Sequence, residues 1–315
     1  MTQPLISFCI PTNGISKWVF PVLDSIYNQQ IDNALFEVVV EDNGKNVEFK
    51  KKMRAYALVH INIQYSETKA HEFLSEVESY KKARGLFIKF INHRTVLKPG
   101  ALQYFIDFVH INKEEKPCVY FGNGVIKSVD GQEKYSTFND FVANLSYFSS
   151  WSTGMGFWKE DFKKIPIDQR YNVLFPHTTI LFNEPKKSKY IIDNNILLDE
   201  LSVGNIPKGR YNLFYAFAVE YPAIICDLLR RNLITEKTFL KVKNENHAFI
   251  QGLYFDYIVL KKGCSYNLEH YKESLDVFYS YKELKKDIFV LFVYRCFRKI
   301  MHLLKICISI GRKGK

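Results

Sequence analysis

The chain has 315 residues, of which 47% are hydrophobic, and this is enough to build a sizeable core. The formal net charge is +11, but the stretch from Ile288 to Lys315 holds seven Lys or Arg and no acid, which leaves about +4 for residues 1–287. Such a distribution disfavours a nucleic-acid-binding face spread over the protein.

The cysteines and the termini bear on the compartment. The six cysteines lie far apart without a CxxC pair, and the N-terminus lacks the charged and apolar regions of an export signal. We expect a protein of a reducing compartment. The best apolar run, Ile288 to Tyr294, is seven residues long, far short of the roughly 20 that span a bilayer, so no membrane span is expected.

Strand and helix patterns alternate over the first hundred residues. Apolar runs predict strands at 5–10, 36–40, 61–65 and 87–91, and helical spacing or composition predicts helices at 16–26, 47–58 and 69–84. Pro11 is expected to end the first strand. Strands separated by helices of this length predict βαβ crossovers and therefore an α/β fold with a mostly parallel sheet.

The pattern changes after Gly100. It predicts helices at 101–111, 159–165 and 171–183, the last of them bent or started at Pro176. It also predicts a strand pair at 118–128, a polar and aromatic connector at 135–148, and a strand at 191–198. After Gly209 the chain is almost wholly helical in pattern. No turn-rich linker sets off an independent domain.

A polar turn follows the buried strand at 87–91. The residues Asn92-His93-Arg94-Thr95 come directly after it, and Lys98-Pro99-Gly100 then opens the next helix. In open α/β sheets, ligands bind outside the carboxyl ends of the strands. We therefore expect chemistry at this turn.

Four short motifs carry a family resemblance. They are Ser7-Phe8-Cys9-Ile10-Pro11-Thr12, then Val39-Val40-Glu41-Asp42-Asn43-Gly44, then Gly85-Leu86-Phe87-Ile88-Lys89-Phe90, then Leu97-Lys98-Pro99-Gly100-Ala101-Leu102. In this order and spacing the chain resembles glycosyltransferase family 2, whose members are inverting, nucleotide-sugar-dependent enzymes with the GT-A fold. The later segments 151–156 and 175–177 resemble a bacterial subgroup that builds O-antigen or capsular polysaccharide.

The resemblance implies a domain organisation. Residues 1–208 form the GT-A-like catalytic domain, with a nucleotide-binding half at about 1–102 and an acceptor half at about 103–208. The resemblance covers roughly the first 200 residues. Beyond it, the sequence pattern itself predicts a helical C-terminal region at 209–287 and a basic amphipathic tail at 288–315.

The resemblance also assigns the donor-binding positions. Pro11 and Thr12 lie where the first strand delivers the chain to the nucleotide base. Asp42 matches the acidic residue that reads the nucleobase or ribose, because a carboxylate accepts a charge-assisted hydrogen bond from an imide N–H or a hydroxyl. A turn-forming aspartate before Asn43-Gly44 is the alternative.

The sequence departs from the family at the turn that follows the fourth strand. The family carries there an Asp-x-Asp motif that holds a divalent metal, usually Mn or Mg, on the donor diphosphate, and this chain has Asn92-His93-Arg94. Hard cations need carboxylate oxygens. Arg94, with His93 if protonated, could replace the metal as the positive group that stabilises the leaving diphosphate, next to Asn92 in the donor site. Other residues could serve instead, including carboxylates that recruit a metal from elsewhere, or the fold could be inactive.

Inverting transfer needs a base for the acceptor hydroxyl. The family places a carboxylate at a helix start where this chain has Pro176-His177, so His177 is the candidate base and Asp168 the reserve. A hydrogen-bonded, half-buried histidine is the alternative. Trp151, with Ser152 and Thr153, is then expected to face the acceptor sugar, although a lone Trp is more often a core residue.

The tail predicts a membrane partner. On helical spacing, cations gather on one face and apolar side chains on the other: Arg295, Arg298, Lys299, His302 and Lys305, against Phe297, Ile300, Met301, Leu304 and Ile308. Basic amphipathic helices of this kind lie on anionic membranes, although packing on the protein itself is the alternative. We expect a cytoplasmic enzyme, peripheral on the inner face of the membrane, that acts on a lipid-linked oligosaccharide. A catalytically silent GT-A domain that binds glycan or scaffolds a membrane assembly is the alternative from another class.

Overall fold

The computed structural model describes residues 3–202, 209–289 and 293, and the chain divides into two compact units. One comprises 1–204 with 224–243, and the other 205–223 with 244–315. The boundaries expected at 208 and 287 stay predictions, because the residues around 208 and nearly all of the basic tail lie outside the described part of the chain.

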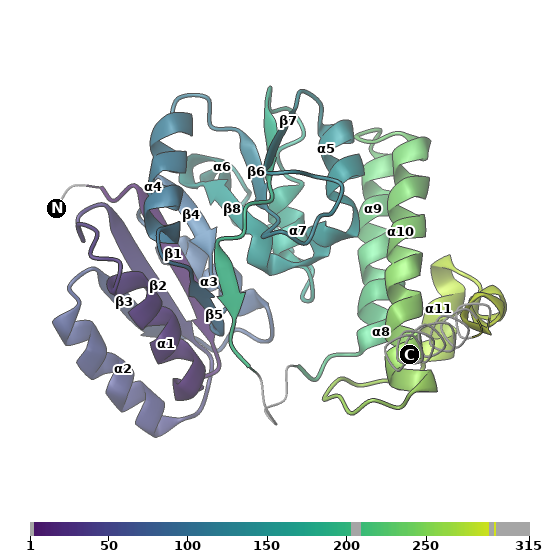
Figure 1. Cartoon of the computed structure of the whole chain (residues 1–315), viewed down its shortest axis with the longest axis horizontal. Coiled ribbons are helices and arrows are strands. Elements are labelled where there is room, and N and C mark those ends of the chain that lie inside the picture. The colour runs from purple at the N-terminus through teal and green to yellow at the C-terminus, as the bar shows by residue number, and fades with distance from the viewer. Residues whose placement is uncertain (1–2, 203–208, 290–292, 294–315) are drawn as a thin grey trace, which may run out of the picture. The chain divides into compact units, whose positions relative to one another are not determined.

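The first unit is built on an eight-stranded sheet in the order β3-β2-β1-β4-β8-β6-β9-β7 (Figure 1). The strands β1 to β4, β6 and β9 are parallel, whereas β8 runs antiparallel between β4 and β6 and β7 runs antiparallel at the edge. Their bounds are β1 Ile6–Thr12, β2 Phe36–Asp42, β3 Ile63–Glu67, β4 Phe87–Phe90, β6 Cys118–Phe121, β7 Gln132–Tyr135, β8 Met155–Trp158 and β9 Tyr190–Asp193. The predicted α/β fold with a mostly parallel sheet is confirmed.

Helices cover both faces of this sheet. Phe8 of β1 contacts the ring of Phe105 in α4, with centroids 5.9 Å apart, whereas the next residue, Cys9, faces the Ser79 carbonyl of α3. Successive side chains of a strand point to opposite faces, so α3 and α4 lie on opposite sides. The helix bounds are α1 Ser16–Tyr27, α2 Val47–Val59, α3 Leu74–Lys82, α4 Ala101–Asn112, α5 Phe138–Leu145, α6 Lys159–Lys163 and α7 Pro176–Leu181.

The first strand runs two residues beyond its predicted end. The prediction that Pro11 ends the strand is wrong, because β1 pairs with β2 through Pro11 and Thr12. On its other side, β1 pairs with β4 only up to Cys9. Pro11 therefore lies at an edge position, where the missing N–H of a proline is tolerated.

The second half of the unit differs most from the sequence predictions. The strand pair expected at 118–128 is wrong, because this range holds one strand, β6, which pairs with β8 and β9. The next strand, β7, was not predicted and pairs antiparallel with β9. The expected connector at 135–148 contains α5, which Thr137 caps by accepting the Asp140 N–H. The strand expected at 191–198 is divided between two strands. The strand β9 ends at Asp193, and β10 (Leu198–Glu200) pairs antiparallel with β5 (Thr95–Leu97) in a separate two-stranded sheet.

Residues after Gly209 are helical, as predicted. The elements are α8 Leu213–Tyr215, a π-helical segment Ala216–Glu220, α9 Tyr221–Arg230, α10 Glu236–Tyr254, a second π-helical segment Phe255–Val259 and α11 Tyr271–Phe278. Within the second unit, the buried Asn246 donates from its amide to the Phe217 carbonyl, 2.8 Å away, and to the Tyr279 hydroxyl, 2.8 Å away. A buried amide with both partners ties α10 to the elements on either side of it.

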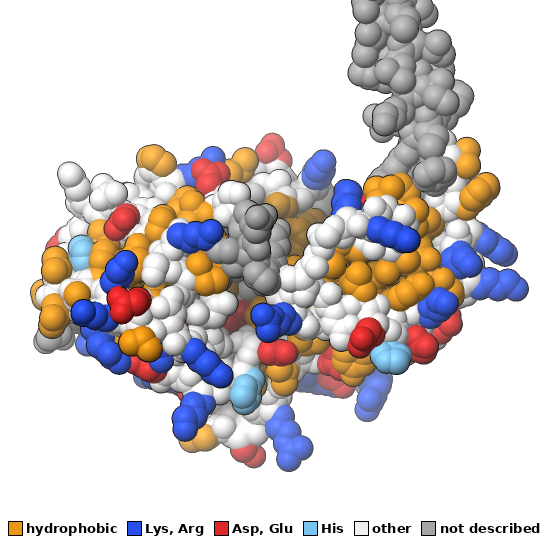
Figure 2. All heavy atoms as spheres, turned by 90° about the horizontal axis from the view of Figure 1, so that it is seen from below, with side chains coloured by type: hydrophobic (Ala, Val, Ile, Leu, Met, Phe, Trp, Pro, Cys, Tyr) orange, Lys and Arg blue, Asp and Glu red, His pale blue; other side chains and the backbone are white. Residues whose placement is uncertain are grey.

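The charged side chains of the described residues are mixed in sign on one face of the molecule. On the face that Figure 2 shows, lysines and arginines are dispersed and interleaved with acidic side chains. No helix in the described part of the chain has both the length and the apolarity to cross a bilayer.

Candidate active site

Three polar turns meet at the carboxyl edge of the sheet. Thr12 of β1 lies in register with Asp42 of β2, and the Thr12 carbonyl accepts the Asn43 N–H at 2.9 Å. From the end of β4, the His93 ring places Nδ1 3.0 Å from Thr12 Oγ1. The fold thus brings together donor-site residues that lie up to 81 positions apart. We call Thr12, Asp42 and the turn Asn92–Arg94 the donor edge.

Asp42 is 1% exposed and has partners for both carboxylate oxygens. Oδ1 accepts the Gly44 N–H at 2.7 Å, and Oδ2 accepts the Tyr65 hydroxyl at 3.0 Å. Burial raises the pKa of Asp42, and these two hydrogen bonds act in the opposite direction. The bond to Gly44 is the turn contact that the alternative from sequence expected, and Tyr65 is a partner that sequence reasoning missed.

Gly44 is required by close packing between two turns. A Cβ atom on Gly44 would lie 2.1 Å from the Asn13 carbonyl oxygen and 2.9 Å from Asp42 Oδ1. Backbone cannot yield as a side chain tip can, so only glycine lets the turns after β1 and β2 approach this closely. The Asp42-Asn43-Gly44 motif thus has a packing reason.

His93 is held as a neutral ring. Burial, with a smaller contribution from the Arg94 charge, lowers the pKa of His93 to about 4. Thr12 Oγ1 already accepts the Gly14 N–H at 3.0 Å, so its own hydrogen is available for Nδ1. The Trp18 ring packs edge-on against the imidazole at 5.1 Å. These surroundings favour the uncharged form of His93 at neutral pH, and the role of a protonated His93 beside a diphosphate stays a prediction.

Arg94 is the cation of the donor edge. Its Nε is buried and has no hydrogen-bond partner within the described residues, while its backbone is held through the Arg94 N–H to Asn92 Oδ1 at 3.2 Å and the Leu201 N–H to the Arg94 carbonyl at 2.8 Å. A buried N–H without an acceptor is costly in a folded protein. An anionic ligand would supply that acceptor.

The donor edge does not fit a divalent metal. Asn92 offers one amide oxygen, already turned to the Arg94 N–H, and Arg94 is a cation. Asp42 is the one carboxylate of the donor edge, and each of its oxygens already accepts one hydrogen bond from the protein. No group of three or more His, Cys, Asp or Glu able to hold a metal occurs among the described residues. A hard cation that requires carboxylate oxygens has no built site here.

Residues 148–155 approach the donor edge from the other half of the unit. They run from a 3₁₀ turn, Ser146–Ser150, through a second one, Ser152–Gly154, into β8. Trp151, Ser152 and Thr153 are partly exposed, and the Trp151 ring packs edge-on against Phe148 at 5.2 Å. The Thr153 carbonyl accepts a bond of 2.7 Å from Lys89 of β4, which joins this segment to the strand that leads into the donor edge.

His177 lies in the core. It is 2% exposed, on the first turn of α7, which Pro176 begins. Its Nε2 lies 2.9 Å from the Ser150 carbonyl and its Nδ1 3.3 Å from a carboxylate oxygen of the buried Glu76. A carbonyl only accepts, so Nε2 carries the hydrogen. These surroundings match the alternative of a hydrogen-bonded buried histidine, and the catalytic role stays a prediction.

The remaining predicted positions differ in exposure. Asp168 is exposed, on a turn that the Gln169 N–H closes against the Pro166 carbonyl at 3.0 Å. Pro11 is partly buried beside Glu41. The fold therefore gathers Thr12, Asp42 and the Asn92–Arg94 turn, and it places Asp168 on an open loop.

Sequence reasoning missed a polar cluster at the same sheet edge. At the end of β9, Asp193 accepts bonds from Tyr104, Gln132 and Asn195. After β6, Asn123 accepts the N–H groups of Leu197 and Leu198 at 2.8 and 2.9 Å. Because protein donors fill these side chains, we interpret them as residues that shape the turns. Their position after apolar runs was the available signal.

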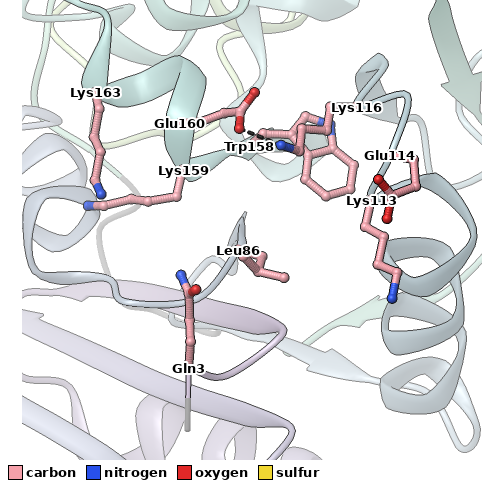
Figure 3. Close-up of a pocket in the computed structure, with 9 residues that line it drawn as sticks. All are labelled: Gln3, Leu86, Lys113, Glu114, Lys116, Trp158, Lys159, Glu160 and Lys163. Carbon is pink, nitrogen blue, oxygen red and sulfur yellow. Dashed lines mark hydrogen bonds and ion pairs between the residues drawn. The ribbon is translucent and has the colours of Figure 1, made fainter.

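A cavity of about 280 Å³ lies at the opposite, amino edge of the sheet (Figure 3). It is lined by Gln3, Leu86, Lys113, Glu114, Lys116, Trp158, Lys159, Glu160 and Lys163. Within it, Lys116 pairs with Glu160, and the Trp158 indole N–H donates to the Pro117 carbonyl at 2.9 Å. The cavity adjoins the start of β4, so it is separate from the donor edge.

The sheet order, the antiparallel β8 between β4 and β6, and the polar turns at the carboxyl edge define a GT-A fold. No protein-family model matches the chain, and no curated protein sequence matches it. Among solved structures, S. aureus TarS 1–349 in complex with UDP-GlcNAc is similar at TM-score 0.59 and 15% identity, with 87% of this chain and 80% of that chain covered.

A second similar structure is a mannosyltransferase from Pyrobaculum calidifontis in complex with GDP-Man and Mn²⁺. It aligns at TM-score 0.50 and 14% identity over 80% of this chain and 75% of that one. Both neighbours are GT-A glycosyltransferases. At such low identities the likeness establishes the fold.

Proposed function

We propose that this protein is an inverting glycosyltransferase that moves a sugar from a nucleotide-sugar donor. The observation that carries the proposal is the donor edge. Its turn Asn92–Arg94 contacts Thr12 through His93, Thr12 lies in register with Asp42, and the buried Arg94 Nε has no hydrogen-bond partner among the described residues. Two structural neighbours were solved with nucleotide sugars, UDP-GlcNAc and GDP-Man, which supports a donor of that class.

In this proposal Arg94 takes the role of a metal. Cleavage of the sugar–phosphate bond develops negative charge on the departing diphosphate, and a positive group aimed at that charge lowers the barrier. A guanidinium binds phosphate oxygens bidentately and stays charged at every physiological pH. Pro11, Thr12 and Asp42 hold the nucleoside, with Asn92 supporting the Arg94 backbone. His93 contributes as a neutral group that orients Thr12.

Inversion requires a base on the face of the sugar opposite the diphosphate. His177 and Asp168 are the candidates from sequence. The buried His177 needs a movement of the Ser150 carbonyl to expose Nε2, whereas Asp168 is already exposed. Trp151, Ser152 and Thr153 bind the acceptor in this proposal, since they are partly exposed on the segment bonded to β4.

The acceptor that we propose is a lipid-linked oligosaccharide of bacterial surface polysaccharide synthesis, such as O-antigen or capsule. This part of the proposal rests on the resemblance of segments 151–156 and 175–177 and on the basic tail at 288–315. The tail would hold the enzyme on the inner face of the cell membrane, where a lipid-linked acceptor is presented. Replacing Arg295, Arg298 and Lys299 together by Gln should abolish co-sedimentation with anionic vesicles; unchanged co-sedimentation would contradict the membrane role.

A catalytically silent GT-A domain is the second candidate. The buried position of His177, with both ring nitrogens facing protein oxygens, favours it. A silent domain can keep a nucleotide site, so binding alone does not separate the two. Turnover does.

Calorimetry with a panel of UDP- and GDP-sugars, run in EDTA and again with Mn²⁺, tests the proposal. We expect binding that is unchanged by EDTA and is weakened about 10- to 100-fold by Arg94→Ala, in line with the loss of a charged hydrogen-bond partner. Arg231→Ala is the matched control, because Arg231 is an exposed residue paired with Asp227. Binding that needs Mn²⁺ would contradict the role of Arg94, and binding without release of UDP or GDP on acceptor addition would favour the silent domain.

A further inference from the structure

A fully buried lysine lies in the middle of β4. Lys89 is 0% exposed, and its ammonium donates to three backbone carbonyls, those of Phe90 at 2.9 Å, Thr153 at 2.7 Å and Met155 at 3.1 Å. An ammonium has three hydrogens, so each has an acceptor. The rings of Phe105 and Phe121 lie 5.7 and 5.3 Å from Nζ, within cation–π range.

Burial of the Lys89 charge destabilises the folded state. Burial lowers its pKa to about 7, which records how strongly the apolar surroundings disfavour the charge. A methionine or leucine would fill a similar volume without that penalty. What the ammonium supplies is specific. A 3₁₀ turn leaves carbonyls without partners in a helix or sheet, and Lys89 reaches the carbonyl of Thr153 in the turn Ser152–Gly154 and that of Met155 at the start of β8.

The carbonyls that Lys89 holds belong to two functional segments at once. Phe90 is two residues before Asn92, the first residue of the donor-edge turn. Thr153 and Met155 belong to residues 148–155, where the acceptor-facing side chains are predicted. One ammonium therefore fixes the end of β4 against this segment.

Other buried side chains hold the same segment by the same device. The Tyr120 hydroxyl of β6 lies 2.6 Å from the Phe148 carbonyl and 2.9 Å from that of Trp151. From α7, Thr178 donates to the Ser149 carbonyl at 2.7 Å and His177 lies 2.9 Å from that of Ser150. Six carbonyls between 148 and 155 thus lie within hydrogen-bond distance of side chains from three different elements, and the single Tyr120 hydroxyl hydrogen is shared between two of them.

Gly154 shows how tightly this arrangement is packed. A Cβ atom on Gly154 would lie 2.1 Å from the Tyr120 ring. Tyr120 is itself buried, so its ring has no free space into which to move. The segment and the side chains that hold it are therefore built as one unit.

We propose that Lys89, with Tyr120, is a positioning residue that fixes residues 148–155 against the end of β4 and so sets the placement of the acceptor relative to the donor. This rests on the proposed glycosyltransferase function. Lys89 does not touch the reacting groups. It acts through the Thr153 and Met155 carbonyls, whose displacement would move Ser152 and Thr153.

Amide hydrogen exchange tests the positioning without reference to activity. In Lys89→Met we expect peptides that cover 148–155 to exchange about tenfold faster or more, while peptides that cover β2 keep their protection. Lys134→Met is the matched control, since Lys134 is exposed on β7. Unchanged exchange at 148–155 in Lys89→Met would overturn the proposal, whatever the activity.

Kinetics test the functional consequence. Lys89→Met should lower transfer to the acceptor by about 10- to 100-fold, because misplacement of about 1 Å can cost that much. UDP or GDP binding and slow donor hydrolysis by water should stay within about threefold of wild type. Transfer, binding and hydrolysis lowered equally would indicate a structural role only and would overturn the positioning role.

Two outcomes separate this proposal from the proposed function. If Lys89→Met does not fold, as judged by its thermal melt, Tyr120→Phe removes two of the carbonyl contacts at nearly constant volume and should loosen the same segment. If wild type binds no nucleotide, the glycosyltransferase function fails, and the exchange experiment still decides whether Lys89 positions residues 148–155.

Discussion

The donor edge and residues 148–155 are fixed in different ways. At the donor edge, each turn closes through local bonds, as Asp42 does with Gly44 and Asn92 with Arg94, and only the meeting of the turns depends on distant contacts such as that of Thr12 with His93. Residues 148–155 are instead held by side chains 27 to 66 positions away in the sequence. The residues in one half of the candidate site can therefore be recognised from short sequence motifs, whereas the contacts in the other half form only when the core has assembled.

We expect the largest loss of turnover from substitution of His177, one of the side chains that contact residues 148–155. His177→Ala should lower turnover about 100-fold or more, because it removes the candidate base and leaves the buried Glu76 without its neighbour. His177→Gln separates the two causes, since its amide can still donate to the Ser150 carbonyl. Recovery to within about tenfold of wild type would show a positioning histidine; a rate as low as that of the alanine variant, in a folded protein, would show a base.

Gly154→Ala should lower the free energy of unfolding through steric overlap at residues 148–155. The new methyl group would overlap the Tyr120 ring, and overpacking of a closed core costs about 3 kcal/mol. Urea unfolding measures this loss. Gly252→Ala is the control, because a Cβ there meets nothing within 4 Å, and alanine in helix α10 should raise the free energy of unfolding slightly. Equal effects of the two substitutions would contradict the packing argument.

The burial of Lys89 should make the free energy of unfolding depend on pH. Burial holds the pKa of Lys89 at about 7 in the folded protein, against an ordinary value of 10.5, so the unfolded state binds more protons between these values. The free energy of unfolding of wild type, relative to Lys89→Met, should therefore be flat below about pH 6 and rise by about 1.4 kcal/mol per pH unit above pH 7.5.

Urea unfolding of both proteins from pH 5.5 to 9 gives this difference directly. The groups that face Lys89 are three carbonyls and two phenylalanine rings, and burial is the cause of its shift. Curves that stay parallel over the whole range would show that Lys89 keeps an ordinary pKa.

The smallest effect is expected at the locally fixed donor edge. Asp42→Asn keeps an oxygen for the Gly44 N–H but loses the charge, so donor affinity should fall about tenfold, the value of one charged hydrogen bond. Tyr65→Phe removes only the hydrogen bond from the Tyr65 hydroxyl of β3 to Asp42 and should change donor affinity by less than threefold. Calorimetry with the nucleotide that wild type binds compares the two. An Asp42→Asn variant with wild-type affinity would leave Asp42 as a turn residue.

Much of the fold was predictable because its signals are local. Apolar runs followed by polar turns marked β1, β2 and β4, and helical spacing marked α1, α2 and α4 within a few residues. The predictions failed where pairing overrode local pattern. Pro11 continues β1 because only one neighbour pairs with it there, and the strand pair expected at 118–128 is absent because β6 pairs with β8 and β9.

The site divides in the same way. Asp42, Asn92 and Arg94 could be proposed from order and residue type, since each follows a strand whose carboxyl end lies at a shared edge. His177 could be placed in order along the chain, but its burial against Glu76 could not. Lys89 stood visibly inside an apolar run, yet a lone charge in a strand does not say which carbonyls it will meet.

By itself the sequence determined the alternation of strands and helices, the polar turns at the strand ends and the absence of the metal-binding carboxylates, because these depend on residues close together in the chain. Only the tertiary structure decided that His93 is neutral, that His177 is enclosed and that Lys89 holds residues 148–155. Those properties depend on burial and on partners distant in sequence, which exist only once the core has closed.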